Sequence, residues 1–421
     1  MAQTVDDAQR ESAELTAFRT RARAFLDEHA PKRRARTGDD RPEAALGDVA
    51  AAKRFQSALY DAGLAGLTWP QPWGQGLTSE HTRIFNEEAS GRMLPTAVYT
   101  IGLGMVIPTL LEFGTDQQKE RYVAKALRGE EVWSQLFSEP GAGSDVASLQ
   151  MRAELDGEEW VLNGQKVWTT GAQHSDFGAV IARTNVEVPK HQGITMFVVD
   201  FKALGVEVRP LRQMTGGTSF NEVFFNDVRI PAANVIGPVD GGWRCAIAML
   251  MNERVAIGSG GGGARGMAGG GAGGGIDPYL RLARAHGVEG DLVVRQGLAD
   301  VYIRQRVLGF IGQRTRAAVK AGKAPGPEGS VAKLAGALLA RRTSDLAIAI
   351  AGAAGQAWEV DDPRGDRWAM SVLMAPASRI AGGTDEVQRN IVGERVLGLA
   401  KEPAVDRDVP FKELRIGTLR T

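Results

Sequence analysis

The 421-residue sequence predicts an α+β fold in which a helical segment, a strand-rich segment and a second helical segment follow one another. Apolar residues recur at helix spacing as far as about residue 128. The hydrophobic period changes to two from about 131 to 236, and the helical period returns from about 241. Strands and helices therefore stand in separate runs and do not alternate as βαβ units. We expect three domains, over residues 1–130, 131–240 and 241–421.

The first segment is predicted to be an N-terminal helical domain. Leu15, Phe18, Ala22, Phe25 and Leu26 follow helix spacing. The run 115–118 (Thr-Asp-Gln-Gln) has the pattern of a capping box, which predicts a helix over 119–127.

The middle segment is predicted to be a small β-barrel or sandwich. Residues 151–155 alternate, Asp156-Gly157 marks a turn, and 159–162 alternate again, which is typical of a hairpin. Further predicted strands are 177–182, 193–200, 206–209 and 222–225.

The last segment is predicted to be a four-helix bundle, because 291–320 and 330–351 are long and rich in Ala, Leu and Val. Gly258–Gly275 is mostly glycine, which loses too much backbone entropy to form a helix. We expect an exposed linker there. A phosphate-binding loop is the weaker interpretation, because neither a preceding strand nor a GK[ST] sequence is present.

Composition excludes several classes of function. Fifty basic and fifty acidic residues give no net charge, which argues against a nucleic-acid-binding protein. The single cysteine, Cys245, can form neither an intramolecular disulfide nor a cysteine zinc site, and the five histidines are scattered, so no metal site is expected. The sequence has no membrane-length apolar run and no recognisable leader, so a cytoplasmic protein is expected.

The most informative stretch is 135–147, Gln-Leu-Phe-Ser-Glu-Pro-Gly-Ala-Gly-Ser-Asp-Val-Ala. Its glycines allow close approach of a ligand to the backbone, and Ser138 and Ser144 offer hydroxyl donors. We expect Glu139 and Asp145 to hold the bend through hydrogen bonds to its amides. These residues alone support a binding loop and a purely structural loop about equally.

A second stretch is 163–172, Asn-Gly-Gln-Lys-Val-Trp-Thr-Thr-Gly-Ala. It is predicted to place Trp168 at a strand end after an Asn-Gly turn. The indole could pack on a flat aromatic cofactor or lie in the barrel core.

These two stretches, in this order and about 30 residues apart, resemble the acyl-CoA dehydrogenase family. The resemblance extends over roughly residues 15 to 405 through four further motifs: 67–70, 113–122, 224–231 and 383–391. It implies the fold of that family and FAD bound between the β domain and the C-terminal bundle. The implied reaction is α,β-desaturation of an acyl-CoA thioester in lipid metabolism such as fatty-acid β-oxidation, with electrons passed to an electron-transferring flavoprotein.

Carried over residue by residue, the resemblance implies two sets of contacts. The cofactor-binding set is Gln135, Phe137, Ser138, Gly143, Ser144, Trp168, Thr170, Thr384 and Glu386. The substrate-binding set is Ser144 and Arg254.

The position of the catalytic base is implied by a departure of this sequence from the family pattern. Many family members carry a glutamate just before the Gly-Thr of the C-terminal motif, where this chain has Gly382. In isovaleryl-CoA and long-chain acyl-CoA dehydrogenases the base lies on an early helix of the C-terminal domain, just before an arginine, and Glu253 occupies that position. The resemblance therefore implies Glu253 as the base, on a partly buried helix with Ile247, Leu250 and Met251. Burial beside the substrate is expected to raise the pKa of a catalytic carboxyl.

Two further departures concern the FAD site between subunits. The Arg-x-x-Phe-Gly segment is replaced by the glycine-rich stretch and Ile276–Tyr279, and Gln-x-x-Gly-Gly-x-Gly is reduced to Gly352–Gly355. Self-association to a dimer or homotetramer is expected, with a mixed tetramer as an alternative.

Two other functions stay open on the sequence: a non-catalytic subunit of a mixed tetramer, and an oxygen-using flavin oxidase or monooxygenase. The acyl group, whether fatty, branched or steroid-derived, is also left open.

Overall fold

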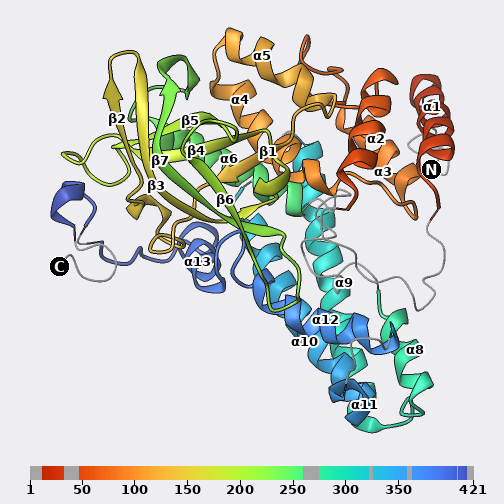
Figure 1. Cartoon of the computed structure of the whole chain (residues 1–421). Helices are drawn as coiled ribbons and strands as arrows, with labels where there is room; N and C mark the ends of the chain where they lie inside the picture. The colour runs from red at the N-terminus through yellow and green to blue at the C-terminus, as the bar shows by residue number, and fades with distance from the viewer. Residues whose placement is uncertain are drawn as a thin grey trace.

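The computed structural model describes residues 12–32, 47–258, 275–321, 326–357, 363–404 and 406–414. Most of the glycine-rich stretch therefore lies outside the described residues. The predicted order is confirmed: helices, then one sheet, then helices (Figure 1).

The N-terminal helices pack around an apolar core that includes Phe18, Leu26, Phe55 and Ile84. The capping box is confirmed, because the Thr115 hydroxyl accepts from the Gln118 backbone and the Gln118 side chain accepts from the Thr115 backbone. The elements are α1 (Ala13–His29), α2 (Val49–Asp61), α3 (Ser79–Ala89), η1 (Ala97–Tyr99), the π-helix η2 (Gly102–Val106), α4 (Ile107–Phe113) and α5 (Asp116–Leu127).

The middle of the chain forms an eight-stranded sheet in the order β6-β7-β3-β2-β4-β5-β8, with β1 paired to β4. The strands are β1 (Trp133–Leu136), β2 (Arg152–Asp156), β3 (Glu159–Thr170), β4 (Phe177–Arg183), β5 (Ile194–Asp200), β6 (Val206–Leu211), β7 (Phe220–Pro231) and β8 (Val235–Ile236). Short 3-10 turns η3 (Val146–Ser148), η4 (Ala172–His174) and η5 (Ala232–Asn234) connect them.

Both faces of the central strands are covered. One face of the sheet encloses a core that includes Leu162, Phe197 and Phe225. The other face packs on a core shared with the helices, which includes Leu110 and Met249. β4 and β5 are therefore almost continuously buried.

The Asn163-Gly164 pair is not a turn, so that prediction was wrong. The pair lies inside β3, which continues to Thr170 with register shifts at Leu162/Gly164 and Lys166/Thr169. Gly164 instead lets the strand pass Met151, because a Cβ there would lie 2.8 Å from the Met151 side chain.

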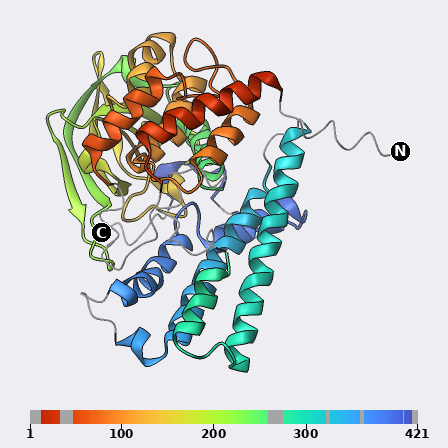
Figure 2. The ribbon, with the colours of Figure 1, turned by 90° about the vertical axis from the view of Figure 1, so that its right-hand side faces the viewer.

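The C-terminal helices form a body that extends away from the sheet (Figure 2). The predicted long helices are confirmed as α9 (Leu292–Lys320) and α10 (Gly329–Ala351), and α10 packs on α9 and α12. The other elements are α6 (Gly242–Gly258), α8 (Asp277–Ala285), α11 (Ala353–Gln356), α12 (Pro363–Ser378), α13 (Asp385–Ile391), the π-helix η6 (Val392–Val396) and η7 (Phe411–Glu413). None of the helices within the described ranges has the length and apolar character needed to span a membrane.

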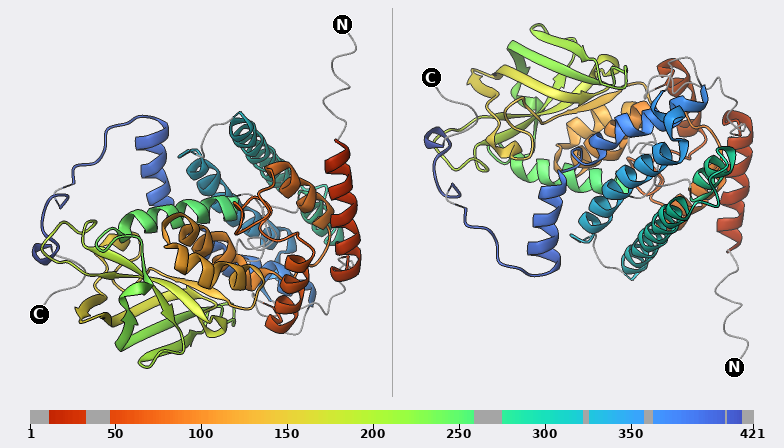
Figure 3. Two further views of the ribbon diagram at one scale, coloured as in Figure 1. Left: turned by 90° about the horizontal axis from the view of Figure 1, so that it is seen from above. Right: turned by 90° about the horizontal axis from the view of Figure 1, so that it is seen from below.

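After η6 the chain crosses back to the sheet (Figure 3). We call residues 406–414 the strap. The Phe411 amide donates to the Val188 carbonyl at 2.9 Å and the Lys412 amide donates to the Val186 carbonyl at 3.0 Å. The strap thus docks η7 on the loop between β4 and β5, next to an isolated bridge between Pro410 and Pro189.

Replacement of Thr115 by alanine removes the N-cap acceptor of α5 and should lower the free energy of unfolding by about 1 kcal/mol. Urea unfolding followed by circular dichroism measures the change. Thr115→Ser keeps the hydroxyl and should unfold like the wild type, and an equal loss in both variants would contradict the capping role.

Candidate active site

The two informative motifs meet at the junction of β1 and β3. The Val167 amide donates to the Ser138 carbonyl at 2.9 Å, and the Ser134 hydroxyl donates to the Thr170 carbonyl at 2.8 Å. Ser138 and Thr170 are half-buried at this junction. Gln135 on β1 is also half-buried, whereas Phe137 is buried in the core shared with the helices.

A buried ion pair links the same two motifs. Lys166 is fully buried, and its Nζ lies 2.8 Å from Oε1 of Glu139 and 3.1 Å from the Phe137 carbonyl. The Glu139 carboxylate also accepts from the Gln150 and Met151 amides at 2.7 and 3.0 Å. Glu139 therefore accepts from backbone amides, but from those of Gln150 and Met151 and not from those of the bend, so that prediction was wrong. Burial lowers the pKa of Lys166, and the Glu139 carboxylate opposes that effect.

Trp168 lies at the second register shift of β3, with a φ of 61°. Its side chain is 61% exposed, and its ring meets Phe220 edge-on with centroids 6.0 Å apart. The indole is therefore not in the barrel core, and its outer surface is available to a flat ligand.

Asp145 does not hold the bend through its amides, so that prediction was wrong. Its carboxylate accepts from the Ser148 hydroxyl and lies 2.8 Å from Nζ of Lys190, which also reaches Asp406 of the strap at 2.6 Å. Gly143 and Ser144 are exposed in the same loop.

Arg183 ties this loop to the strap. Its buried guanidinium donates to the Ala147, Leu149 and Lys190 carbonyls. The Phe411 ring covers it, with the guanidinium carbon 3.7 Å from the ring centroid. The strap therefore completes the packing beneath the loop that carries Ser144.

Glu253 and Gly382, 129 positions apart in the sequence, are neighbours in space. A Cβ on Gly382 would lie 3.4 Å from Oε1 of Glu253. Glu253 follows buried Met249 by one helical turn on α6 and is itself half-buried. Ile247 is 44% exposed, so the apolar surroundings predicted for Glu253 hold only in part.

Thr384 and Glu386 begin α13. The Thr384 hydroxyl accepts from the Val387 amide at 3.2 Å as an N-cap, and exposed Glu386 pairs with Arg389 at 3.4 Å. Two buried acceptors in the same turn, Oδ1 of Asp385 and Oε1 of Gln388, have no hydrogen-bond donor. A ligand with hydroxyl or amino donors would satisfy them.

The Arg254 side chain lies outside the described part of the structure, so its predicted substrate contact stays a prediction. Cys245 is buried, and burial raises the pKa of its thiol to about 11, as expected for a core residue. In the described ranges no group of three or more His, Cys, Asp or Glu side chains could hold a metal ion.

Sequence reasoning missed four polar residues that organise the site: Lys166, Arg183, Lys190 and Lys333. Nζ of Lys333, on α10, donates to the Gly383 carbonyl at 2.5 Å. Their partners lie far away in the sequence, so no local spacing indicates them.

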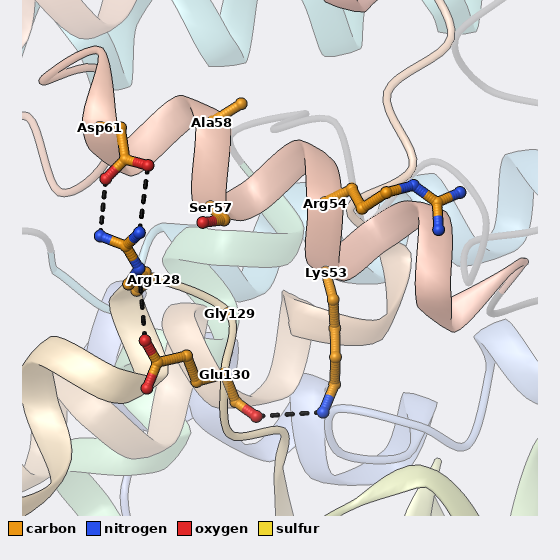
Figure 4. Close-up of a pocket in the computed structure, with 8 residues that line it drawn as sticks. All are labelled: Lys53, Arg54, Ser57, Ala58, Asp61, Arg128, Gly129 and Glu130. Atoms are coloured by element: carbon orange, nitrogen blue, oxygen red, sulfur yellow. Dashed lines mark hydrogen bonds and ion pairs between the residues drawn. The ribbon is translucent and has the colours of Figure 1, made fainter.

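A surface depression of about 490 Å³ lies elsewhere, between α2 and the end of α5. Four of its charged side chains are held by contacts within the depression, because Arg128 pairs with Asp61 and Glu130, and Lys53 donates to the Glu130 carbonyl (Figure 4).

Three family models match the chain in order. They are the acyl-CoA dehydrogenase N-terminal domain over residues 12–130, the middle domain over 134–228 and the C-terminal domain over 240–397.

Relatives and solved structures agree with these matches. Acyl-CoA dehydrogenase FadE34 of Mycobacterium tuberculosis is 37% identical over 369 residues, 86% of this chain and 49% of FadE34, so the chain spans about half of that relative. Acyl-CoA dehydrogenase IpdE1 of the same organism is 37% identical over 351 residues, 83% of this chain and 88% of IpdE1. The Tcur3481-Tcur3483 steroid ACAD is 27% identical with a TM-score of 0.76, covering 93% of this chain and 99% of that one. The ChsE4-ChsE5 complex from Mycobacterium tuberculosis is 28% identical with a TM-score of 0.72 and the same coverage.

Lys166→Met should lower the free energy of unfolding by about 3–5 kcal/mol, because it leaves the Glu139 carboxylate buried without its cation. Thermal and urea unfolding measure this loss. Adding Glu139→Gln removes the unpaired charge and should restore part of the stability. A double variant less stable than Lys166→Met would contradict a charge-pair origin.

Phe411→Ala should loosen the loop that the strap supports, since it uncovers the Arg183 guanidinium. We expect faster hydrogen exchange at the amides of residues 145–150, measured by mass spectrometry, with unchanged exchange in α1. Unchanged exchange in both segments would show that the strap does not hold the loop.

Proposed function

Because the chain belongs to the acyl-CoA dehydrogenase family, whose members are FAD-dependent flavoproteins, we propose that it desaturates an acyl-CoA thioester with Glu253 as the base. The observation that carries the proposal is the nearness of Glu253 to Gly382, because a Cβ on Gly382 would lie 3.4 Å from Oε1 of Glu253. Gly382 has no side chain, so it leaves room for the carboxylate that α6 brings to the same place. The two positions thus supply one carboxylate between them.

The described residues fit FAD. Trp168 exposes an aromatic face at the β3 bulge, and Asp385 and Gln388 present buried acceptors without donors, which the hydroxyl and amino groups of FAD could satisfy. Bound FAD supplies the acceptor for the hydride that leaves the β carbon.

We propose that Ser138, Trp168 and Thr170 contact the flavin side of the cofactor. Thr384 and Glu386 would contact the rest of it. The remaining members of the predicted set are proposed to line the same cofactor site, from β1 and the segment that follows it: Gln135, Phe137, Gly143 and Ser144.

Glu253 would accept the α proton of the thioester. Its half-buried position limits access of water to the carboxylate, and general-base catalysis by a placed carboxylate contributes about 10²–10⁴-fold to rate. Ser144 and Arg254 are proposed to contact the CoA portion.

A steroid-derived acyl group is the substrate class that we would test first. The support is likeness to the Tcur3481-Tcur3483 steroid ACAD, at 27% identity and near-complete coverage. Fatty and branched acyl groups belong in the same test.

We propose that the chain works in an assembly and passes electrons to an electron-transferring flavoprotein. Exposed apolar side chains on α9, including Tyr302, Ile303 and Phe310, offer a surface for another subunit. Two of the similar solved structures carry two-component names, which favours a mixed assembly over a homotetramer. The domain boundaries near 130 and 240 and a cytoplasmic location stay predictions.

A non-catalytic subunit of a mixed assembly is the second candidate, because this chain lacks the Arg-x-x-Phe-Gly segment. It predicts a colourless protein when purified alone. An oxidase would instead be recognised by rapid reoxidation of the reduced flavin in air.

Glu253→Gln should bind acyl-CoA but slow flavin reduction by at least about 100-fold, because the amide cannot accept the α proton. The measurement is anaerobic bleaching of the flavin by isovaleryl-CoA, palmitoyl-CoA and a steroid side-chain acyl-CoA. A variant that bleaches as fast as the wild type would show that another group is the base.

The double variant Glu253→Ala/Gly382→Glu should recover at least about 10-fold of the rate lost in Glu253→Ala, because it returns a carboxylate to the same region. Full recovery is not expected, since the φ of 66° at residue 382 strains a non-glycine residue. A flavin-loaded double variant no faster than Glu253→Ala would argue against a shared catalytic position.

A further inference from the structure

The side chain of Lys190 joins the strap to the loop that carries Ser144. Its Nζ lies 2.8 Å from Oδ2 of Asp145, the neighbour of Ser144, and 2.6 Å from Oδ2 of Asp406 in the strap. The Lys190 side chain is 10% exposed, so a single, nearly buried ammonium holds both segments.

Both carboxylates act on this ammonium. Burial lowers the pKa of Lys190, but the hydrogen bonds to Asp145 and Asp406 outweigh that effect and raise the pKa above its usual value. The same ammonium lowers the pKa of Asp406. Loss of the Asp406 carboxylate would therefore leave a nearly buried cation with one partner fewer.

Arg183 provides a second connection between the strap and this loop. Its guanidinium donates to the Ala147 carbonyl and lies beneath the Phe411 ring, 3.7 Å from the ring centroid. It also donates to the Lys190 carbonyl at 2.6 Å, which fixes the backbone that presents the ammonium. The loop is thus held at two points, Asp145 and Ala147.

Packing on the outer side of the loop does not hold Ser144 in place. Ser144 is exposed, and a Cβ added to Gly141 or Gly143 would meet no atom within 4 Å. The bend before Ser144 is closed by backbone hydrogen bonds between Glu139 and Ala142. Ser144 therefore lies between this closed bend and the contact that Lys190 makes with Asp145.

We propose that Lys190 is a positioning residue, which couples docking of the strap to the position of Ser144 and thereby sets the affinity for the CoA portion of the substrate. The inference rests on the proposed function, in which Ser144 contacts CoA. A loop that occupies its binding position for only part of the time lowers the apparent affinity by that fraction. It leaves the chemical step of the bound substrate unchanged.

Three variants test the coupling. Lys190→Met removes both ion pairs, and Asp406→Asn removes only the carboxylate of the strap. Asp408→Asn is the matched control, because it makes the same change at an exposed position of the same strap. Each flavin-containing protein is titrated with coenzyme A by calorimetry. It is also mixed anaerobically with increasing concentrations of the most reactive acyl-CoA of the panel above, which gives the limiting bleaching rate.

The dissociation constant of coenzyme A should rise about 3- to 10-fold in Lys190→Met and Asp406→Asn, as for a loop that is in place roughly a third to a tenth of the time. The limiting bleaching rate should stay within about twofold of the wild type, because only binding is weakened. Asp408→Asn should match the wild type in both measurements. The double variant Lys190→Met/Asp406→Asn should bind like Lys190→Met, since Asp406 acts through Lys190.

Flavin content and melting temperature are measured for each variant. A purely structural role would lower the limiting rate together with the affinity, and that result overturns the inference. So does wild-type affinity in folded Lys190→Met and Asp406→Asn. If Lys190→Met does not fold, Asp406→Asn still tests the coupling, because that carboxylate is 38% exposed.

Ser144→Ala is measured alongside to separate the inference from the proposed function. If Ser144→Ala binds coenzyme A like the wild type, the proposed CoA contact fails, and the inference fails with it. Weaker binding by Ser144→Ala, beside unchanged binding by the Lys190 and Asp406 variants, refutes the role of Lys190 alone.

Discussion

The buried pair of Lys166 and Glu139 is the interaction on which the arrangement of the β domain depends. One carboxylate accepts from an ammonium and from two backbone amides, so β3, the bend after β1 and the start of β2 converge on it. A carboxylate without these donors would be costly at that depth. The pair therefore ties together the motifs that carry Ser138 and Trp168.

The proposed catalytic centre, by contrast, is assembled from the C-terminal helices. Glu253 comes from α6, its neighbouring wall from the turn before α13, and the lysine that holds this turn from α10. Each element supplies one group, so small shifts between helices would alter the centre without unfolding the domain. This dependence gives a physical reason for the polar contacts that tie the turn to both sides.

Local patterns predicted most of the fold. Helix spacing located α1, and long stretches rich in Ala, Leu and Val located α9 and α10. The capping box located the start of α5, because its donors and acceptors lie within one turn. Asn163-Gly164 misled the prediction, since the pair is typical of hairpin turns but here relieves a close approach to Met151. The position of Glu253 came from resemblance, and its contact with Gly382 could not be predicted from spacing. The same holds for Lys190 and Asp406, because nothing local marks a pair 216 residues apart.

The strap is synthesised well after the strands of the β domain, and this order affects how the domain is completed. The strands of the β domain leave the ribosome about 170 residues before the strap, a delay of roughly 10–30 s at ordinary rates of bacterial and eukaryotic elongation. During that interval Arg183 has no aromatic cover and Lys190 has Asp145 but not Asp406. The nascent β domain can thus form its sheet early, while the loop bearing Ser144 acquires its final support only once the strap has been synthesised.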